Sequence, residues 1–400
     1  MTTDRARIEP SFSLYLDLVR FVAAVLVVLE HVRQWGVVNE WQARLLPSAG
    51  RESVIVFFVL SGFVIAYSTG SKNTSIREYF AARLTRIYSV ALPVLLLSFG
   101  IAASLSYLFD RNVVHFYQLD HAAVYLPFHL LFLGEFWNMA ETPPLLAPYW
   151  SLSHEVWYYV LFGLVCYLRG PARLVLCTCV IAAMGPKLWL LLPVWGSGVF
   201  LFHWLERHAI PQRTARIGWL ASVVLLVAYN ASGLEDQLRP IVRSLWPFVR
   251  IRLGSGERVV TDYLVCALIL VNFACARFAG FSGLKRFASP IRNLAFFTFS
   301  LYLAHPLVLG TWRSLHRHDA GEFSLLLSMA LSIAASTWAL GRLAEFLRLR
   351  TLAWINELEG RRASAGWTAV IASKLGRIRE LGLVDPLAPH ETEIRKRDRK

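Results

Sequence analysis

The chain is poor in charged residues and in cysteines for its length, and both shortages limit what it can be. Of its 400 residues, 17% are charged and 56% are hydrophobic, whereas an ordinary soluble chain has about 25% charged and about 45–50% apolar residues. The apolar residues lie in long blocks, which excludes an ordinary soluble domain and indicates a polytopic membrane protein. The five cysteines lie in or beside these blocks without the spacing of a zinc site, so we expect no metal.

Positive charge is the one charge in excess. The net charge of +14 would suit nucleic acid, but 13 of the 41 Lys and Arg lie from Arg342 onward, after the last apolar block. Contact with anionic membrane lipids explains a basic tail beside a membrane more simply. We therefore expect membrane lipids as partners and no nucleic acid.

The apolar blocks predict an all-α, multi-pass protein with about ten transmembrane helices. The predicted spans lie near residues 12–34, 53–68, 88–108, 154–168, 173–185, 188–205, 217–231, 259–276, 294–312 and 323–341. The segment 122–137 is apolar but interrupted by Pro127 and His129. We expect a re-entrant or interfacial helix there, with a full span as the alternative.

The positive charges also predict the orientation. With the N-terminus in the cytoplasm, the inner loops carry 15 Lys and Arg against 12 in the outer loops, and the basic tail is also inside. Both termini are therefore expected in the cytoplasm. We expect a membrane domain over residues 1–341 and a basic tail over residues 342–400, amphipathic at first and disordered at its end.

Asp17, Arg20 and His31 all lie in the first predicted span, where ionisable side chains are costly and usually functional. At about 100° per residue, Arg20 and His31 return to within roughly 20° of each other, ~16 Å apart along the axis. Asp17 lies close to the same stripe. The alternative is structural, with an Asp17–Arg20 salt bridge and His31 directed outward to the interface.

Arg83 and Arg86 come just before the third predicted span. At positions i and i+3 they share one helical face. Two guanidinium groups on one face suit a bidentate phosphate contact at the cytoplasmic surface. An ordinary positive flank of a membrane span would look the same.

The sequence YWSLSHEVWYY opens the fourth predicted span. Glu155 would enter the membrane from the outer side, at a depth similar to that of His31. Trp150 and Ser153 would line a cavity shared with His31, or an acceptor site. The alternative for Glu155 is a capping box with Ser151 or Ser153.

Two further motifs place polar groups inside spans. Ser61 and Gly62 in FFVLSGF let a second backbone or a slim ligand approach closely, and we favour tight helix packing as the explanation of this motif. Tyr302 and His305 lie in SLYLAHP. His305 lines the same cavity as His31, or it only bonds across helices.

These five patterns, in this order over residues 12–341, resemble the integral-membrane acyltransferase 3 family. The resemblance rests on Arg20 and His31 eleven positions apart, FFVLSGF, Arg83 with Arg86, WSLS-x-E and the late S-x-x-Y-L-x-H-P. It differs at Ser89, where the family often has proline, and at His154 beside the acid. The resemblance implies a bacterial inner-membrane enzyme that transfers an acyl group, usually acetyl, from cytoplasmic acyl-CoA to a hydroxyl of a cell-envelope glycan or lipid-linked saccharide.

The resemblance also implies roles for the candidate residues. Arg20, Arg83 and Arg86 would bind acyl-CoA, which is a donor substrate and not a bound cofactor. His31 would be the general base, directly or through an acyl-histidine, and Glu155 would orient it. A proton-coupled transporter is the alternative, because it too needs intramembrane charges. The oligomeric state, the acyl chain and the acceptor are not specified by the sequence.

Overall fold

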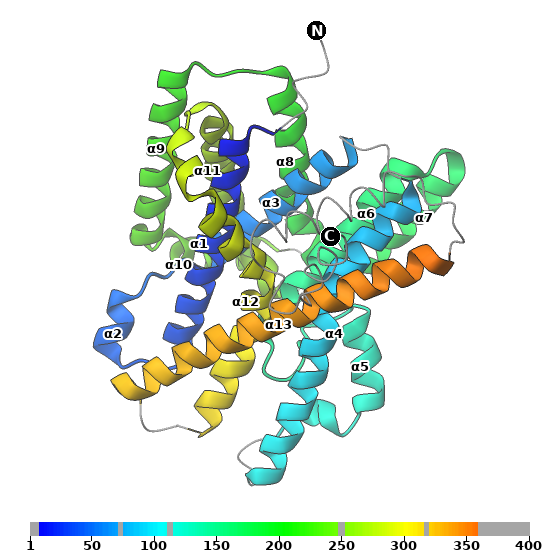
Figure 1. Cartoon of the computed structure of the whole chain (residues 1–400), viewed down its shortest axis with the longest axis vertical. Coiled ribbons are helices and arrows are strands. Elements are labelled where there is room, and N and C mark those ends of the chain that lie inside the picture. Colours follow the sequence, from blue (N-terminus) through cyan, green and yellow to red (C-terminus); the bar gives the residue numbers. More distant parts are fainter. Residues whose placement is uncertain (1–7, 71–74, 110–114, 247–252, 316–319, 359–400) are drawn as a thin grey trace, which may run out of the picture. The chain divides into compact units, whose positions relative to one another are not determined.

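The computed structural model describes residues 8–70, 75–109, 115–246, 253–315 and 320–358. Within these ranges the chain is helical and contains no strand (Figure 1). It divides into two units, Met1–Arg348 and Leu349–Lys400, and the site described below lies within the first. The helices of ten residues or more are α1 (Pro10–Gln34), α3 (Gly50–Gly70), α4 (Ile76–Leu108), α6 (Trp150–Tyr167), α7 (Gly170–Met184), α8 (Pro186–Arg207), α9 (Gln212–Ser232), α10 (Leu234–Leu245), α11 (Val259–Phe278), α12 (Ala288–Leu315) and α13 (Phe323–Leu358).

The chain is a polytopic membrane protein, as predicted. Each of the ten predicted spans falls on one of these helices, and eight helices of the described residues are long and apolar enough to cross a membrane. The other two predicted spans correspond to α6 and to α7, a shorter apolar helix of 15 residues. The total of ten spans and the cytoplasmic termini stay predictions.

The interrupted segment 122–137 does not form a spanning helix, so the full-span alternative is wrong. Its helix, α5 (Ala122–Leu130), has only nine residues, and Phe132 and Trp137 then take positive φ angles of 56° and 48°. A buried ion pair of 3.1 Å between Glu135 and Lys187 fastens this non-helical stretch to the start of α8. Backbone outside a helix needs such protein cover at membrane depth.

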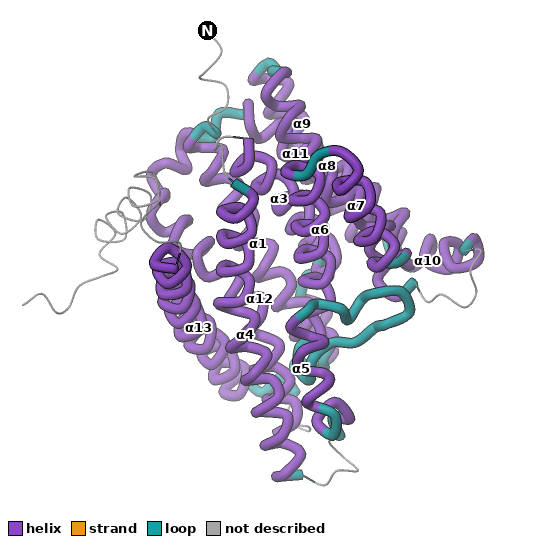
Figure 2. The backbone as a smooth tube through the Cα atoms, turned by 90° about the vertical axis from the view of Figure 1, so that its right-hand side faces the viewer, coloured by secondary structure: helices purple, strands orange, loops and turns teal. Residues whose placement is uncertain are grey.

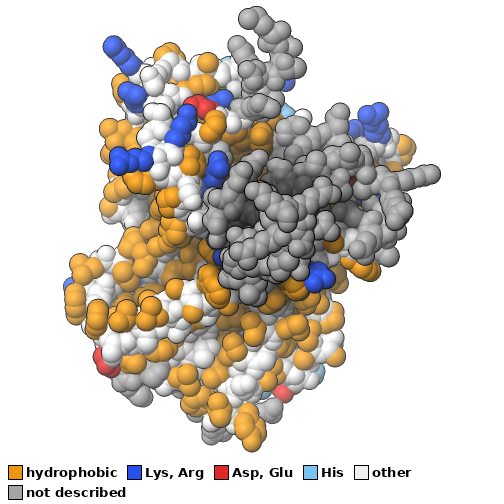
Figure 3. All heavy atoms as spheres, viewed as in Figure 1, with side chains coloured by type: hydrophobic (Ala, Val, Ile, Leu, Met, Phe, Trp, Pro, Cys, Tyr) orange, Lys and Arg blue, Asp and Glu red, His pale blue; other side chains and the backbone are white. Residues whose placement is uncertain are grey.

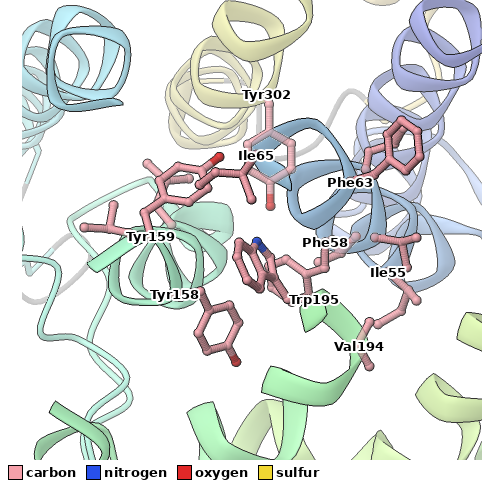
Figure 4. Packing of buried hydrophobic residues seen from close by; sticks show 14 of the residues in the cluster. Ile55, Phe58, Phe63, Ile65, Tyr158, Tyr159, Val194, Trp195 and Tyr302 are labelled. Carbon is pink, nitrogen blue, oxygen red and sulfur yellow. The ribbon is translucent and has the colours of Figure 1, made fainter. Parts of the chain in front are cut away.

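Helix α3 lies at the centre of the first unit, in contact with α1, α8 and α11. Glycines allow it to approach α8 closely: a methyl group on Gly62 would lie 2.0 Å from the Trp195 carbonyl oxygen, and one on Gly198 equally close to that of Val59. Gly62 therefore serves helix packing, the structural alternative for this motif. Figure 4 shows Trp195 projecting from α8 between α3 and α6.

Large apolar side chains also face outward, as lipid-facing helices require. Phe200 of α8 and Val227 of α9 are 64% and 65% exposed. Figure 3 shows hydrophobic side chains over much of one face, with Lys and Arg side chains gathered at the end of the first unit where α1 begins. Figure 2 shows α1, α3 and α8 running along one another, with α5 and the irregular stretch after it to one side.

The predicted boundary at residue 341 does not coincide with the end of a helix. Helix α13 continues without a break to Leu358. The predicted amphipathic segment beyond that point, and the predicted disordered end, lie outside the described residues. The division into a membrane domain and a basic tail therefore stays a prediction.

Candidate active site

His31 of α1 and His305 of α12 form a direct contact, which we call the histidine pair. His31 Nδ1 lies 3.0 Å from His305 Nε2, and the two rings stack with centroids 5.2 Å apart. His305 is completely buried and His31 is half-buried. His31 therefore does not extend outward to the interface, as the structural alternative required, because it is held between α12 and Trp35 of its own helix.

Around the histidine pair, α12 is joined to the start of α6 through hydroxyl groups. The hydroxyls of Tyr302 and Ser151 lie 2.7 Å apart, and both can donate to the Pro148 carbonyl, at 3.3 and 3.1 Å. Tyr302 lies one helical turn before His305, with ring centroids 6.2 Å apart. The hydroxyl pair thus fixes the part of α12 that carries His305.

Arg51 and Asp262 form a buried ion pair that the sequence analysis did not single out. Arg51 Nε and Nη2 donate to the two carboxylate oxygens of Asp262 at 2.8 and 2.5 Å. The Arg51 guanidinium also lies over the Trp150 ring, 5.1 Å from its centroid. Breaking such a buried pair costs about 3–5 kcal/mol, so it holds α3, α6 and α11 together. The sequence feature that could have indicated this pair is Asp262, an acidic residue near the start of an apolar span.

Glu155 lies away from the histidine pair, in a cluster of hydroxyl groups. Its carboxylate accepts a hydrogen bond from Ser61 at 2.9 Å and another from Tyr159, one turn further along α6. Trp195 Nε1 donates to Ser61 at 3.1 Å. We call Ser61, Glu155, Tyr159 and Trp195 the carboxylate cluster, and Figure 4 shows Tyr159 and Trp195 converging on α3.

The depth of this cluster follows from the pairing of α1 with α3. Glu30 packs on Gly50 at the start of α3, and Phe12 packs on Phe63, so the two helices run antiparallel. Ser61 is eleven residues beyond Gly50, or ~16 Å along the axis. Its partner Glu155 therefore lies near the level of Arg20 and not of His31.

Two interpretations of Glu155 are therefore corrected. Its expected contact with His31 is wrong, because among the described residues His31 bonds to His305 and Glu155 bonds to Ser61 and Tyr159. The capping box is also wrong: α6 has no side-chain cap, and Ser151 donates to Pro148. The sequence showed which polar residues enter the bilayer, but the depth of Glu155 depends on the turn Ala147–Tyr149 before α6.

Arg20, Arg83 and Arg86 form a cationic group at the level of the carboxylate cluster, which we call the arginine cluster. Arg20 pairs with Asp17 over a long 3.4 Å, with the two side chains 22% and 23% exposed, and the charges of Arg86 and Glu155 act on it. Arg83 donates to Ser68 and lies over the Tyr159 ring, 5.9 Å from its centroid.

The charges of the arginine cluster are only partly balanced. Three guanidinium groups face two carboxylates, those of Asp17 and Glu155, and the Arg86 side chain is exposed. Arg83 Nε is buried and makes no hydrogen bond. Such an excess of positive charge with unused donors suits an anionic ligand.

Two neighbouring residues are explained by packing. Ser153 is 2% exposed in the first turn of α6. His154, the unusual neighbour of the acid, is completely buried, lies 3.1 Å from the Trp150 carbonyl through Nδ1 and packs on Phe58. Neither residue contacts the histidine pair or the arginine cluster within the described part of the chain. No group of three metal-ligating side chains occurs there either.

A family model described as an acyltransferase domain, that of acyltransferase 3, matches residues 13–342. No curated protein and no solved structure matches the chain significantly. The matched range contains the histidine pair, the carboxylate cluster and the arginine cluster.

Proposed function

Because this chain belongs to the acyltransferase 3 family, we propose that it transfers an acyl group from acyl-CoA to a hydroxyl of a cell-envelope glycan or lipid-linked saccharide. Membership of this family supports the activity of a membrane acyltransferase. We propose in addition that the donor is acyl-CoA, that the acyl group is usually acetyl, that the acceptor is a glycan, and that the protein lies in the bacterial inner membrane. The observation that carries them is the arrangement along α1, with the arginine cluster at one level and the histidine pair ~16 Å further along.

The arginine cluster is proposed to face the cytoplasm. It lies on the half of α1 nearer its N-terminus, and Lys and Arg side chains gather at this end of the first unit (Figure 3). Positive residues favour the cytoplasmic side of a membrane. Both termini would then be cytoplasmic, and the histidine pair would lie in the outer half of the bilayer, within reach of an acceptor outside.

The donor would be bound at its nucleotide end. Arg83 and Arg86 would hold phosphate groups by charge-assisted hydrogen bonds, for which Arg83 has a buried unpaired N–H group. Arg20 would adjoin the start of the pantetheine arm. An extended arm is comparable in length with the ~16 Å that separate Arg20 from His31, so the thioester would reach the histidine pair.

Glu155 would act in donor binding. Its bonds to Ser61 and Tyr159 hold the aromatic ring under Arg83, and its charge acts on Arg20. These contacts support a role in shaping the arginine cluster. They replace the earlier prediction that Glu155 orients the base.

His31 would be the general base of the transfer. Its imidazole would take the proton of the acceptor hydroxyl as the oxygen attacks the thioester carbon. A C–O bond forms, the C–S bond breaks, and the proton passes to the leaving thiolate to give CoA as the free thiol. Such proton transfer typically contributes about 10²–10⁴-fold to the rate. Transfer through an acyl-histidine is a second route through the same ring.

A transfer assay tests the proposed function. Purified protein in lipid nanodiscs is incubated with radiolabelled acetyl-CoA and a crude envelope glycan fraction, and label in the glycan and free CoA are both measured. We expect both products to appear together and to require the protein. If CoA binds but neither product forms with acetyl-CoA, succinyl-CoA or longer acyl-CoA donors, the enzymatic proposal is wrong, and a carrier or sensor is favoured.

A further inference from the structure

We propose that His305 is a positioning residue, which holds His31 in the one neutral form that leaves its Nε2 atom free to accept a proton. The use of that free nitrogen rests on the proposed function, whereas its hydrogen-bonding state follows from the contacts alone.

The backbone of α12 fixes the proton on His305. Its Nδ1 lies 2.8 Å from the Leu301 carbonyl oxygen, and a carbonyl can only accept, so Nδ1 carries the hydrogen. The ring is completely buried, and no carboxylate bonds to it among the described residues, which favours its neutral form. A neutral imidazole has one ring hydrogen, and His305 Nε2 is therefore an acceptor.

The position of the ring hydrogen on His305 fixes the position of the ring hydrogen on His31. His31 Nδ1, 3.0 Å from this acceptor, must be the donor. In a neutral ring the lone pair then lies on His31 Nε2. That atom makes no hydrogen bond within the described part of the chain and is not fully buried. It is thus both unprotonated and accessible, as a general base must be.

The order of residues in SLYLAHP explains why α12 can do this. Pro306 has no N–H group, so the Tyr302 carbonyl, four residues earlier, has no helical donor. The Leu301 carbonyl oxygen lies 2.8 Å from Nδ1 of the His305 ring. His305 therefore has a backbone acceptor at its Nδ1 side, and its Nε2 side faces His31 on the neighbouring helix.

The pair also suits the charge that forms during transfer. When His31 Nε2 takes the proton, its Nδ1–H still donates to the neutral His305 ring, which stabilises the imidazolium without a carboxylate. In a Ser-His-Asp triad an acid has this position. Here the acid that the sequence predicted for this role, Glu155, bonds to Ser61 and Tyr159.

Three variants of α12 test the positioning role in the full chain. His305→Gln keeps an acceptor near the Nε2 position, and His305→Phe keeps the ring shape without an acceptor. Thr311→Ala is the matched control, because Thr311 also donates to the carbonyl four residues earlier in α12, at 2.7 Å. We expect His305→Phe to lower kcat by about 10–100-fold, with most of kcat retained in His305→Gln, an unchanged donor KM in both, and wild-type kinetics in Thr311→Ala.

A spectroscopic measurement tests the same inference without turnover. In protein labelled with ¹⁵N-histidine, the resonances absent from His31→Gln assign His31. At a pH where the ring is neutral, we expect its hydrogen on Nδ1 in the wild type and a shift toward Nε2 in His305→Phe.

The outcomes separate this inference from the proposed function. A hydrogen on His31 Nε2 in the wild type, or unchanged kcat in His305→Phe, overturns the positioning role even if transfer occurs. Equal losses in His305→Gln and His305→Phe also overturn it, because they indicate a purely structural role. A hydrogen on Nδ1 in a protein that transfers no acyl group supports the positioning contact and contradicts the proposed function.

Discussion

Two levels along α1 carry polar groups of opposite character, that of Arg20 in the middle of the helix and that of His31 near its C-terminal end. The arginine cluster keeps an excess of charge, with Arg20 22% exposed and paired to Asp17 over a long 3.4 Å. In the histidine pair His305 is completely buried, and its ring hydrogen-bonds only to a backbone carbonyl and to His31 among the described residues. Unbalanced charge suits binding of an anion, and a neutral imidazole with a fixed hydrogen suits proton transfer. The comparison therefore assigns donor binding to the level of Arg20 and the transfer reaction to the level of His31.

The largest expected effect is at the histidine pair. His31→Gln removes the base while keeping a polar side chain, and we expect kcat to fall by about 10²–10⁴-fold with the donor KM unchanged. Steady-state transfer of radiolabelled acetyl groups measures both values, and size-exclusion profiles of the variant control for folding. Wild-type turnover in His31→Gln would show that His31 is not the base of the transfer.

The next largest effect is at the arginine cluster. Arg83→Ala with Arg86→Ala removes charge-assisted bonds worth about 1.5–3 kcal/mol each, so we expect the donor KM to rise by at least about tenfold. At saturating donor, kcat should stay near that of the wild type. Arg213→Ala with Arg216→Ala, a second pair at i and i+3 in α9, is the control. An unchanged donor KM in the Arg83 and Arg86 variant would refute the phosphate role.

The smallest effect separates the two assignments of Glu155. Glu155→Ala removes the bonds that hold Ser61 and Tyr159, and neutral or charged hydrogen bonds are worth about 1–3 kcal/mol. We expect the donor KM to rise by about five- to tenfold, and Glu155→Gln, which keeps hydrogen-bonding capacity, to retain more of the wild-type value. If Glu155→Ala instead lowers kcat at constant KM, the predicted partnership with His31 is restored.

Much of the architecture could be predicted from the sequence, because apolar length is a local property. All ten predicted spans fall on helices, and Pro127 and His129 correctly indicated that 122–137 would not span. Of the polar residues within spans, Asp17, Arg20, His31 and His305 were also found. The Asp17–Arg20 pair and a shared site for His31 and His305 were among the alternatives. The direct contact of the two histidines was not predicted, since it joins residues 274 positions apart.

Glu155 shows where local reasoning fails. Its motif gave the right residue type, but its level depends on how the turn before α6 and the pairing of α3 with α6 place that helix. The Arg51–Asp262 pair was missed for a related reason, because each residue alone resembles the flank of a span. Both cases depend on tertiary register, which hydropathy does not contain.

Donor binding and transfer, measured side by side in two variants, test the separation of roles most directly. Equilibrium binding of acetyl-CoA and single-turnover transfer at saturating donor are compared for His31→Gln and for Arg83→Ala with Arg86→Ala. We predict that His31→Gln binds acetyl-CoA like the wild type and transfers almost nothing, whereas the arginine variant binds weakly and transfers at nearly the wild-type rate. Loss of the same quantity in both variants would contradict the assignment of donor binding and acyl transfer to separate levels along α1.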